Sequence, residues 1–158
     1  MAHYYLDSSA LVKRYVAEPG TAWIENLCDA GSGHTIYIVR ISGVEMVAAL
    51  FRRAHSGSLA LADAQAQTAQ LKADLPYDYV IAEVTEPLVE AAMTLAERHR
   101  LRGYDAVQLA AALELRAALV ASDLPTLTFV CADADLNAAA TAEGFPIDNP
   151  NAHSSSAA

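Results

Sequence analysis

Four acidic side chains stand where an apolar stretch of the sequence gives way to a helical pattern. They are Asp7, Glu45, Asp105 and Asp133. Asp7 and Asp133 directly end apolar stretches, whereas Glu45 and Asp105 fall at or just inside the first turn of a predicted helix. Because the carboxyl ends of parallel strands meet at one edge of an α/β sheet, we expect these distant residues to lie together there.

Carboxylates gathered at one place repel one another unless a cation lies among them. Mg²⁺ and Mn²⁺ prefer oxygen ligands, and Mg²⁺ keeps several waters while it takes one or two carboxylates directly. Three or four acids can therefore hold one or two such ions and leave positions open for water and substrate. A bound ion lowers the pKa of water, orients it toward phosphorus and neutralises the leaving oxygen. The pattern is typical of metal-assisted phosphoryl chemistry.

Each acid also has a purely structural explanation. Asp7 is a favoured helix N-cap residue, and Ser42 with Glu45 has the spacing of a capping box. Asp105 and Asp133 would meet the positive end of a helix dipole. Taken singly, the cap explains Glu45 better than a site does. The shared placement of all four acids favours a site.

Length and composition bound the class of protein. The 158 residues are 54% hydrophobic and 18% charged, which predicts one folded domain. We expect that domain over 1–150 and a disordered tail over 151–158. The longest uninterrupted apolar stretch, 46–51, is far shorter than the ~20 residues of a membrane span. Without a secretory pattern at the N-terminus, a cytoplasmic location is expected.

Net charge and cysteine content exclude fewer classes of protein than length and composition do. A net charge of −9 is unusual for a nucleic-acid partner, but cations bound at an acidic site would reverse the local field. The basic residues are grouped at 13–14, 52–53 and 98–102, and these groups could form a phosphate-contacting rim or simply be solvated helix faces. Cys28 and Cys131 lack Cys-x-x-Cys spacing, which favours two reduced thiols.

Strand and helix patterns alternate along the chain. Strands are predicted over 4–6, 35–41, 79–84 and 127–132, with a brief edge strand at 145–147. Helices are predicted over 9–17, 21–29, 42–56, 59–72, from 86 onward, 103–122 and 134–142. Pro76 is expected to separate a helix from the following strand. This order predicts an α/β fold, with a mostly parallel central sheet of four to five strands flanked by helices on both faces.

Four blocks of this sequence resemble the PIN-domain ribonucleases, and specifically the VapC-like toxins of toxin–antitoxin pairs. The blocks are 6–13 (LDSSALVK), Glu45 followed by 48–50 (AAL), 103–110 (GYDAVQLA) and 129–133 (FVCAD). The resemblance extends over about 4–145. It implies a PIN-like fold in which Asp7, Glu45, Asp105 and Asp133 form an acidic quartet that binds Mg²⁺ or Mn²⁺. Ser9 matches the hydroxyl that supports the first aspartate, and Cys131 stands where the family often has Thr or Ser.

The resemblance further implies a metal-dependent endoribonuclease that hydrolyses RNA with a metal-activated water. It implies a cognate antitoxin protein that covers the site, and a homodimeric toxin. A serine nucleophile at Ser8 or Ser9 is disfavoured, because no Gly-x-Ser-x-Gly elbow surrounds them. The alternative is a catalytically inactive PIN-like binding module, against which the presence of all four acids counts.

Overall fold

Five parallel strands form one sheet in the computed structural model, which describes residues 1–154. The spatial order is β3-β2-β1-β4-β5, so the first strand is central. The strands are β1 (His3–Leu6), β2 (Thr35–Val39), β3 (Val80–Ala82), β4 (Leu127–Val130) and β5 (Ile147–Asp148). Tyr5 of β1 is in register with Tyr37 of β2 and Phe129 of β4. The predicted parallel α/β sheet is confirmed.

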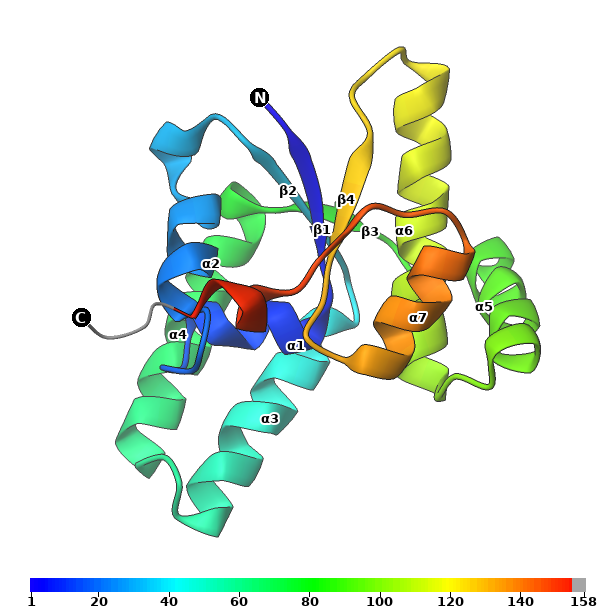
Figure 1. Cartoon of the computed structure of the whole chain (residues 1–158). Coiled ribbons are helices and arrows are strands. Elements are labelled where there is room, and N and C mark those ends of the chain that lie inside the picture. Colours follow the sequence, from blue (N-terminus) through cyan, green and yellow to red (C-terminus); the bar gives the residue numbers. More distant parts are fainter. Residues whose placement is uncertain (155–158) are drawn as a thin grey trace.

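Helices cover both faces of this sheet (Figure 1). They are α1 (Ser8–Leu11), α2 (Thr21–Cys28), α3 (Ser42–Ser56), α4 (Leu61–Asp78), α5 (Glu86–His99), α6 (Gly103–Ala121) and α7 (Ala134–Ala142). Short 3₁₀ turns are η1 (Val12–Arg14), η2 (Ala30–Ser32) and η3 (Pro150–His153). Helices α5, α6 and α7 pack on one face, and α1 to α4 on the other.

The alternation of side chains along β1 builds two cores. Tyr5 enters the core beneath α6, where its ring stacks on Phe129 with centroids 5.5 Å apart. The next residue, Leu6, points to the opposite core with Ile24 and Met46. Successive strand side chains face opposite sides of a sheet, so an apolar strand with both faces covered must be central. The chain after β1 is thereby fixed at the carboxyl edge.

The strands predicted over 35–41, 79–84 and 127–132 are each shorter, and the edge strand is 147–148 rather than 145–147. Two predicted helices also differ from the observed ones. The helix expected over 9–17 is the short α1 followed by η1. Pro76 does not end its helix but lies in the last turn of α4. That turn is anchored from outside, because Asp74 accepts a hydrogen bond from the Tyr15 hydroxyl and Asp78 forms an ion pair with Arg14. A proline this close to the helix end removes one backbone hydrogen bond, which the anchoring contacts offset.

The chain after β5 continues as an ordered turn. His153 of η3 stacks on Trp23 of α2 with ring centroids 4.1 Å apart, and its imidazole contacts Asp148 at 2.6 Å. Residues 151–154 of the segment expected as a disordered tail are therefore described, and 155–158 lie outside the described residues. Among residues 1–154, no helix is long and apolar enough to cross a membrane.

Candidate active site

Helices α1, α3, α6 and α7 begin at the carboxyl edge of the sheet, and the start of each carries one of the four acids (Figure 1). Asp7 follows β1 and caps α1, and Asp133 follows β4 and caps α7. Glu45 lies in the first turn of α3 after β2, and Asp105 lies in the first turn of α6. Each carboxylate is thus carried by the start of a helix. This is the placement that the sequence predicted.

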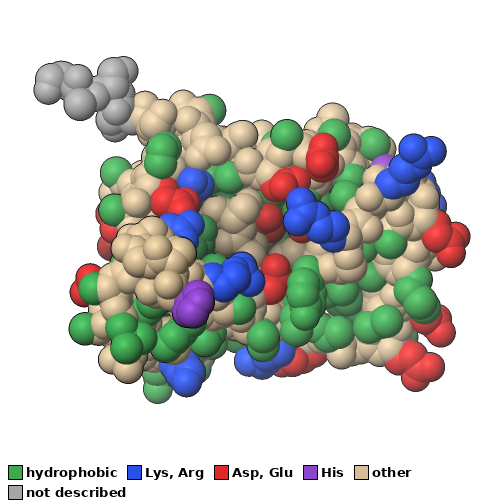
Figure 2. Space-filling view, turned by 90° about the horizontal axis from the view of Figure 1, so that it is seen from below, with side chains coloured by type: hydrophobic (Ala, Val, Ile, Leu, Met, Phe, Trp, Pro, Cys, Tyr) green, Lys and Arg blue, Asp and Glu red, His purple; other side chains and the backbone are tan. Residues whose placement is uncertain are grey.

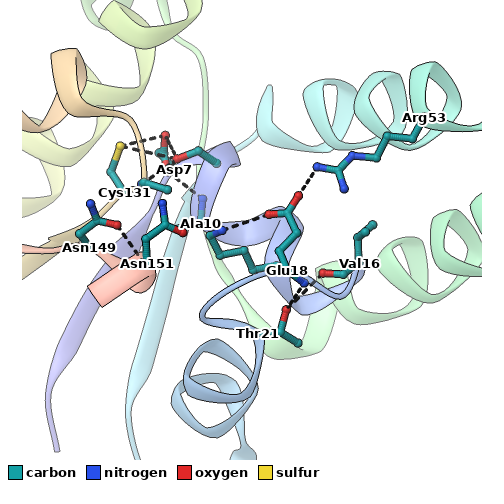
Figure 3. A network of polar contacts seen from close by, with 12 residues as sticks. Asp7, Ala10, Val16, Glu18, Thr21, Arg53, Cys131, Asn149 and Asn151 are labelled. Atoms are coloured by element: carbon teal, nitrogen blue, oxygen red, sulfur yellow. Dashed lines mark hydrogen bonds and ion pairs between the residues drawn. The ribbon is translucent and has the colours of Figure 1, made fainter. Parts of the chain in front are cut away.

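Asp7 is buried, with 3% of its surface exposed, yet no cation pairs with it among the described residues. Its Oδ1 accepts the backbone N–H of Ala10 at 3.0 Å. The Ser9 hydroxyl lies 2.7 Å from Oδ1 and 2.9 Å from Oδ2, and the Cys131 thiol donates to Oδ2 at 3.2 Å (Figure 3). Burial raises the pKa of Asp7 to about 6, although these hydrogen bonds act in the opposite direction.

The Cys131 thiol makes hydrogen bonds that a hydroxyl group could make at this position. Its sulfur donates to Asp7 and also accepts the backbone N–H of Asp133 at 3.2 Å. The neighbouring Ala132 N–H donates to Ser9 Oγ at 2.9 Å. Burial raises the pKa of the Cys131 thiol, which therefore stays protonated and able to donate. The thiol and the serine hydroxyl together hold the segment after β4 against Asp7.

Gln108 forms a hydrogen bond with Glu45, a role that was not predicted from the sequence. Its Nε2 lies 2.9 Å from Glu45 Oε1 and 3.0 Å from each of the Ser8 and Ser42 hydroxyls. Its Oε1 accepts the Tyr5 hydroxyl at 2.6 Å, and the side chain is fully buried. A lone amide three residues after Asp105, on a helix otherwise rich in Ala and Leu, was the available signal.

The capping box predicted for Ser42 and Glu45 is wrong. The N-cap of α3 is Ile41, and no side chain caps this helix. Ser42 is instead the first helical residue and is buried against Gln108. The Glu45 carboxylate accepts from Gln108 rather than reaching back to the cap, so the purely structural explanation for Glu45 is removed.

The pKa of Asp105 is influenced by the charges of several neighbouring residues. Burial raises its pKa, and the charges of Asp133, Glu45 and Asp135 raise it further, while Arg102 lowers it. Asp105 lines two neighbouring hollows. One, of about 440 Å³, includes Asp133. The other, of about 390 Å³, includes Glu45 and Ser9.

The donor chemistry fits a hard divalent cation. None of the four carboxylates forms an ion pair with Lys, Arg or His within residues 1–154. The pKa values of Asp7 and Asp105 are both raised, so a cation among these oxygens would relieve both burial and repulsion. In the described part of the chain, however, no three Asp, Glu, His or Cys side chains converge closely enough to hold an ion as they are now oriented.

The first basic group does not surround the site. Lys13 is buried and pairs with Glu18 at 3.0 Å, and Glu18 also pairs with Arg53 of α3 (Figure 3). Arg14 binds Asp78 at 2.6 Å. These side chains tie the segment after η1 to α3 and α4, so their role is structural.

Known proteins resemble this chain in sequence or in fold. The family model described as "PIN domain" matches residues 4–124. No curated protein sequence matches the chain. Among solved structures, PAE2754 from Pyrobaculum aerophilum is 18% identical, with a TM-score of 0.64, over 96% of this chain and 85% of that one.

Two further structures share the fold. VapC20 of Mycobacterium tuberculosis, a sarcin-ricin loop cleaving toxin, is 18% identical with a TM-score of 0.60, over 90% of this chain and 95% of its own. VapBC2 from Rickettsia felis, solved bound to a DNA fragment from its promoter, is 15% identical with a TM-score of 0.55, over 94% and 98%. Identities this low show a shared fold and no more. Since the family model covers most of the chain, the protein belongs to the PIN-domain family.

Proposed function

We propose that this protein is a metal-dependent endoribonuclease that hydrolyses RNA phosphodiester bonds, and that it is the toxin of a toxin–antitoxin pair. The observation that carries the proposal is the set of four carboxylates at the carboxyl edge of a PIN-domain sheet, none of which has a cationic partner within residues 1–154. Of the four, Asp7 is buried, and a buried carboxylate without a cationic partner among the described residues disfavours the fold. Its presence indicates a functional requirement.

The chain's own residues divide the work of the site. Asp7, Glu45, Asp105 and Asp133 would hold Mg²⁺ or Mn²⁺, directly or through water. When bound, such an ion lowers the pKa of water and neutralises charge on the leaving oxygen.

Neighbouring residues position these carboxylates. Ser9 and Cys131 fix the Asp7 carboxylate from two sides, and Gln108 fixes Glu45. Asp105 stays accessible, because it opens into both hollows. Asp7 and Glu45 are therefore held by hydrogen bonds from neighbouring side chains, and the half-buried Asp105 faces the space available to substrate.

Two partners belong to this proposal. One is a cognate antitoxin that covers the site, which is supported by the fold shared with VapBC2, a protein solved with promoter DNA. The other is a second copy of the chain, giving a homodimer in the cytoplasm. A small DNA-binding protein encoded beside this one, recovered with it after co-expression, is the expected finding for the antitoxin. The lack of any such neighbour would contradict the toxin role.

Cleavage of RNA by the purified protein tests the proposal. We expect fragmentation of mixed cellular RNA with Mg²⁺ or Mn²⁺, none with EDTA, and none from Asp7→Asn or Asp105→Asn. Asp29→Asn is the matched control, because Asp29 is an exposed helix-capping aspartate distant from the four acids in the sheet. Activity that survives chelation, or survives both substitutions, would refute the mechanism. Inactivity of the wild type with every metal and RNA would favour an inactive binding module.

A further inference from the structure

Three arginines near the acids have no ionic or hydrogen-bonded partner in the described part of the chain, unlike most of the basic side chains. Most Lys and Arg side chains bind an acceptor in the protein, as Arg98 and Arg116 do at Glu143. Within residues 1–154, the basic side chains with no ionic or hydrogen-bonded partner are Arg52, Lys72, Arg100 and Arg102. Three of these four line the hollows beside Asp105.

The two hollows form one groove across the acidic site. We call the first the α7 hollow, which is lined by Arg100, Arg102, Asp105 and Asp133. The second is the α3 hollow, which is lined by Arg52, Arg102, Tyr104, Asp105 and Glu45. Arg102 and Asp105 belong to both. Viewed from this edge of the sheet, acidic side chains lie in a central depression with Lys and Arg side chains to either side (Figure 2).

The α3 hollow offers an exposed tyrosine ring, which the α7 hollow lacks. Its wall carries Val44 and Tyr104, which are 62% and 57% exposed, together with Ala48 and Ala49 of α3. A tyrosine ring with this exposure is available for stacking on a nucleobase. The α7 hollow combines two arginines with the carboxylates of Asp105, Asp133 and Asp135, and its one aromatic ring, His99, contacts Glu143 at 2.6 Å. The α3 hollow therefore suits a base, and the arginines of the α7 hollow suit phosphate once a bound cation offsets the carboxylates.

Arg100 occupies a backbone position that favours glycine. It follows the last residue of α5 with φ of +55°, in the left-handed region. Glycine is the usual residue at such helix ends, because a side chain there is strained. An arginine that adopts this conformation and has no protein partner indicates that its side chain serves another purpose.

We propose that single-stranded RNA lies along this groove, with a base stacked on Tyr104 in the α3 hollow and backbone phosphates bound by Arg52, Arg102 and Arg100. The proposal rests on the ribonuclease function and adds the path of the RNA across the site and the hollow in which a base is bound. Guanidinium groups bind phosphate oxygens through paired N–H donors. The base contact then lies on the Tyr104 side of the cleaved bond, because the α7 hollow contacts phosphates, which carry no sequence information.

Binding of a fluorescently labelled ten-nucleotide RNA of mixed sequence, followed by anisotropy in EDTA and again in CaCl₂, tests the phosphate contacts. We expect Arg52→Ala and Arg100→Ala each to weaken binding and to reduce the salt dependence, log K against log salt, by about 0.7 to 1. Lys72→Ala is the matched control, since it removes the same charge from an unpartnered, exposed residue outside both hollows. Equal effects of Arg100→Ala and Lys72→Ala, or no RNA binding by the wild type, would overturn the proposal.

Tyr104 variants test the stacking contact in the same assay. Tyr104→Phe should bind like the wild type, and Tyr104→Ala should bind about 5- to 150-fold more weakly. Tyr77→Ala, which removes an 87% exposed tyrosine of α4 outside both hollows, is the control. Similar binding by Tyr104→Ala and Tyr77→Ala would overturn the stacking role. If the protein cleaves RNA but these variants bind RNA like the wild type, the ribonuclease proposal stands and the RNA path along the groove is refuted. If the variants show the expected binding defects but the wild type cleaves no RNA, the RNA path stands and the ribonuclease proposal is refuted.

Discussion

Replacement of Asp7 by asparagine should make the metal-free protein more stable. The Asp7 carboxylate is buried without a cation, and burial raises its pKa from 3.8 to about 6. An asparagine has nearly the same shape, and its Oδ1 can still accept the Ala10 N–H that caps α1 and the Ser9 hydroxyl. Its Nδ2, at the place of Oδ2, can donate to the Cys131 sulfur, which now acts as the acceptor. The substitution therefore removes a charge that opposes folding while it keeps the local hydrogen bond.

The expected magnitude follows from the pKa shift. The shift from 3.8 to about 6 is roughly two units, and each unit corresponds to ~1.36 kcal/mol. Between these two pKa values the native state binds more protons than the unfolded chain does, so the contribution of Asp7 becomes unfavourable as the pH rises from about 4 to about 6. Asp7→Asn should exceed the wild type in unfolding free energy by about 3 kcal/mol at pH 7.5 and by about 1 kcal/mol at pH 4.5.

Urea denaturation in EDTA at the two pH values measures this difference. Asp29→Asn, which changes an exposed cap in the same way, should shift the unfolding free energy by less than about 0.5 kcal/mol. Addition of millimolar Mn²⁺ should raise the melting temperature of the wild type by mass action and leave that of Asp7→Asn nearly unchanged. An Asp7→Asn protein less stable than the wild type at pH 7.5 in EDTA would refute the reasoning.

Substitutions at three further residues test the contacts of the acids. Cys131→Ala should lower the unfolding free energy by about 1–3 kcal/mol in urea denaturation, since the Asp133 N–H loses its acceptor, and Cys131→Ser should restore much of it. Gln108→Leu should lower the same quantity by about 3 kcal/mol, because it leaves the buried Tyr5 and Ser42 hydroxyls and the Glu45 carboxylate without their partner. Asp133→Asn should lower the pKa of Asp105, as seen by carboxyl NMR titration, while burial keeps it above the ordinary value.

Each of these has an outcome that would contradict it. Wild-type stability in Cys131→Ala would mean that the thiol contacts contribute nothing. Wild-type stability in Gln108→Leu would place the true support of Glu45 elsewhere. An unchanged Asp105 titration in Asp133→Asn would show that the two carboxylates do not share a field.

Local patterns predicted the parts of the fold that local chemistry determines. The helix predicted over 134–142 is observed with the same bounds, and Asp133 caps it as its residue type favours. The strand-ending acids were visible because the change from apolar to polar residues is itself local. Their shared edge followed from the parallel sheet, which the alternation of strands and helices predicted.

Contacts between distant residues account for what the sequence did not predict. Gln108 contacts residues 63 and 103 positions away, Glu45 and Tyr5, so its role depends on the whole fold. The extension of α4 past Pro76 depends on Arg14, 64 positions before Asp78. The Ser42 spacing matched a local motif, but Gln108 competes for the serine hydroxyl and the Glu45 carboxylate. A local pattern fails where a distant buried partner makes the stronger contact.

The chemical identity of the cleaved ends distinguishes hydrolysis by water from attack by the ribose 2′-hydroxyl. If the four acids direct water at phosphorus, a defined RNA incubated with the protein and Mg²⁺ or Mn²⁺ should yield 5′-phosphate and 3′-hydroxyl ends. A 2′-deoxy substitution at the cleaved position should not abolish the reaction, because the 2′-hydroxyl is not the nucleophile. Products ending in 2′,3′-cyclic phosphate, formed equally well in EDTA, would contradict the account.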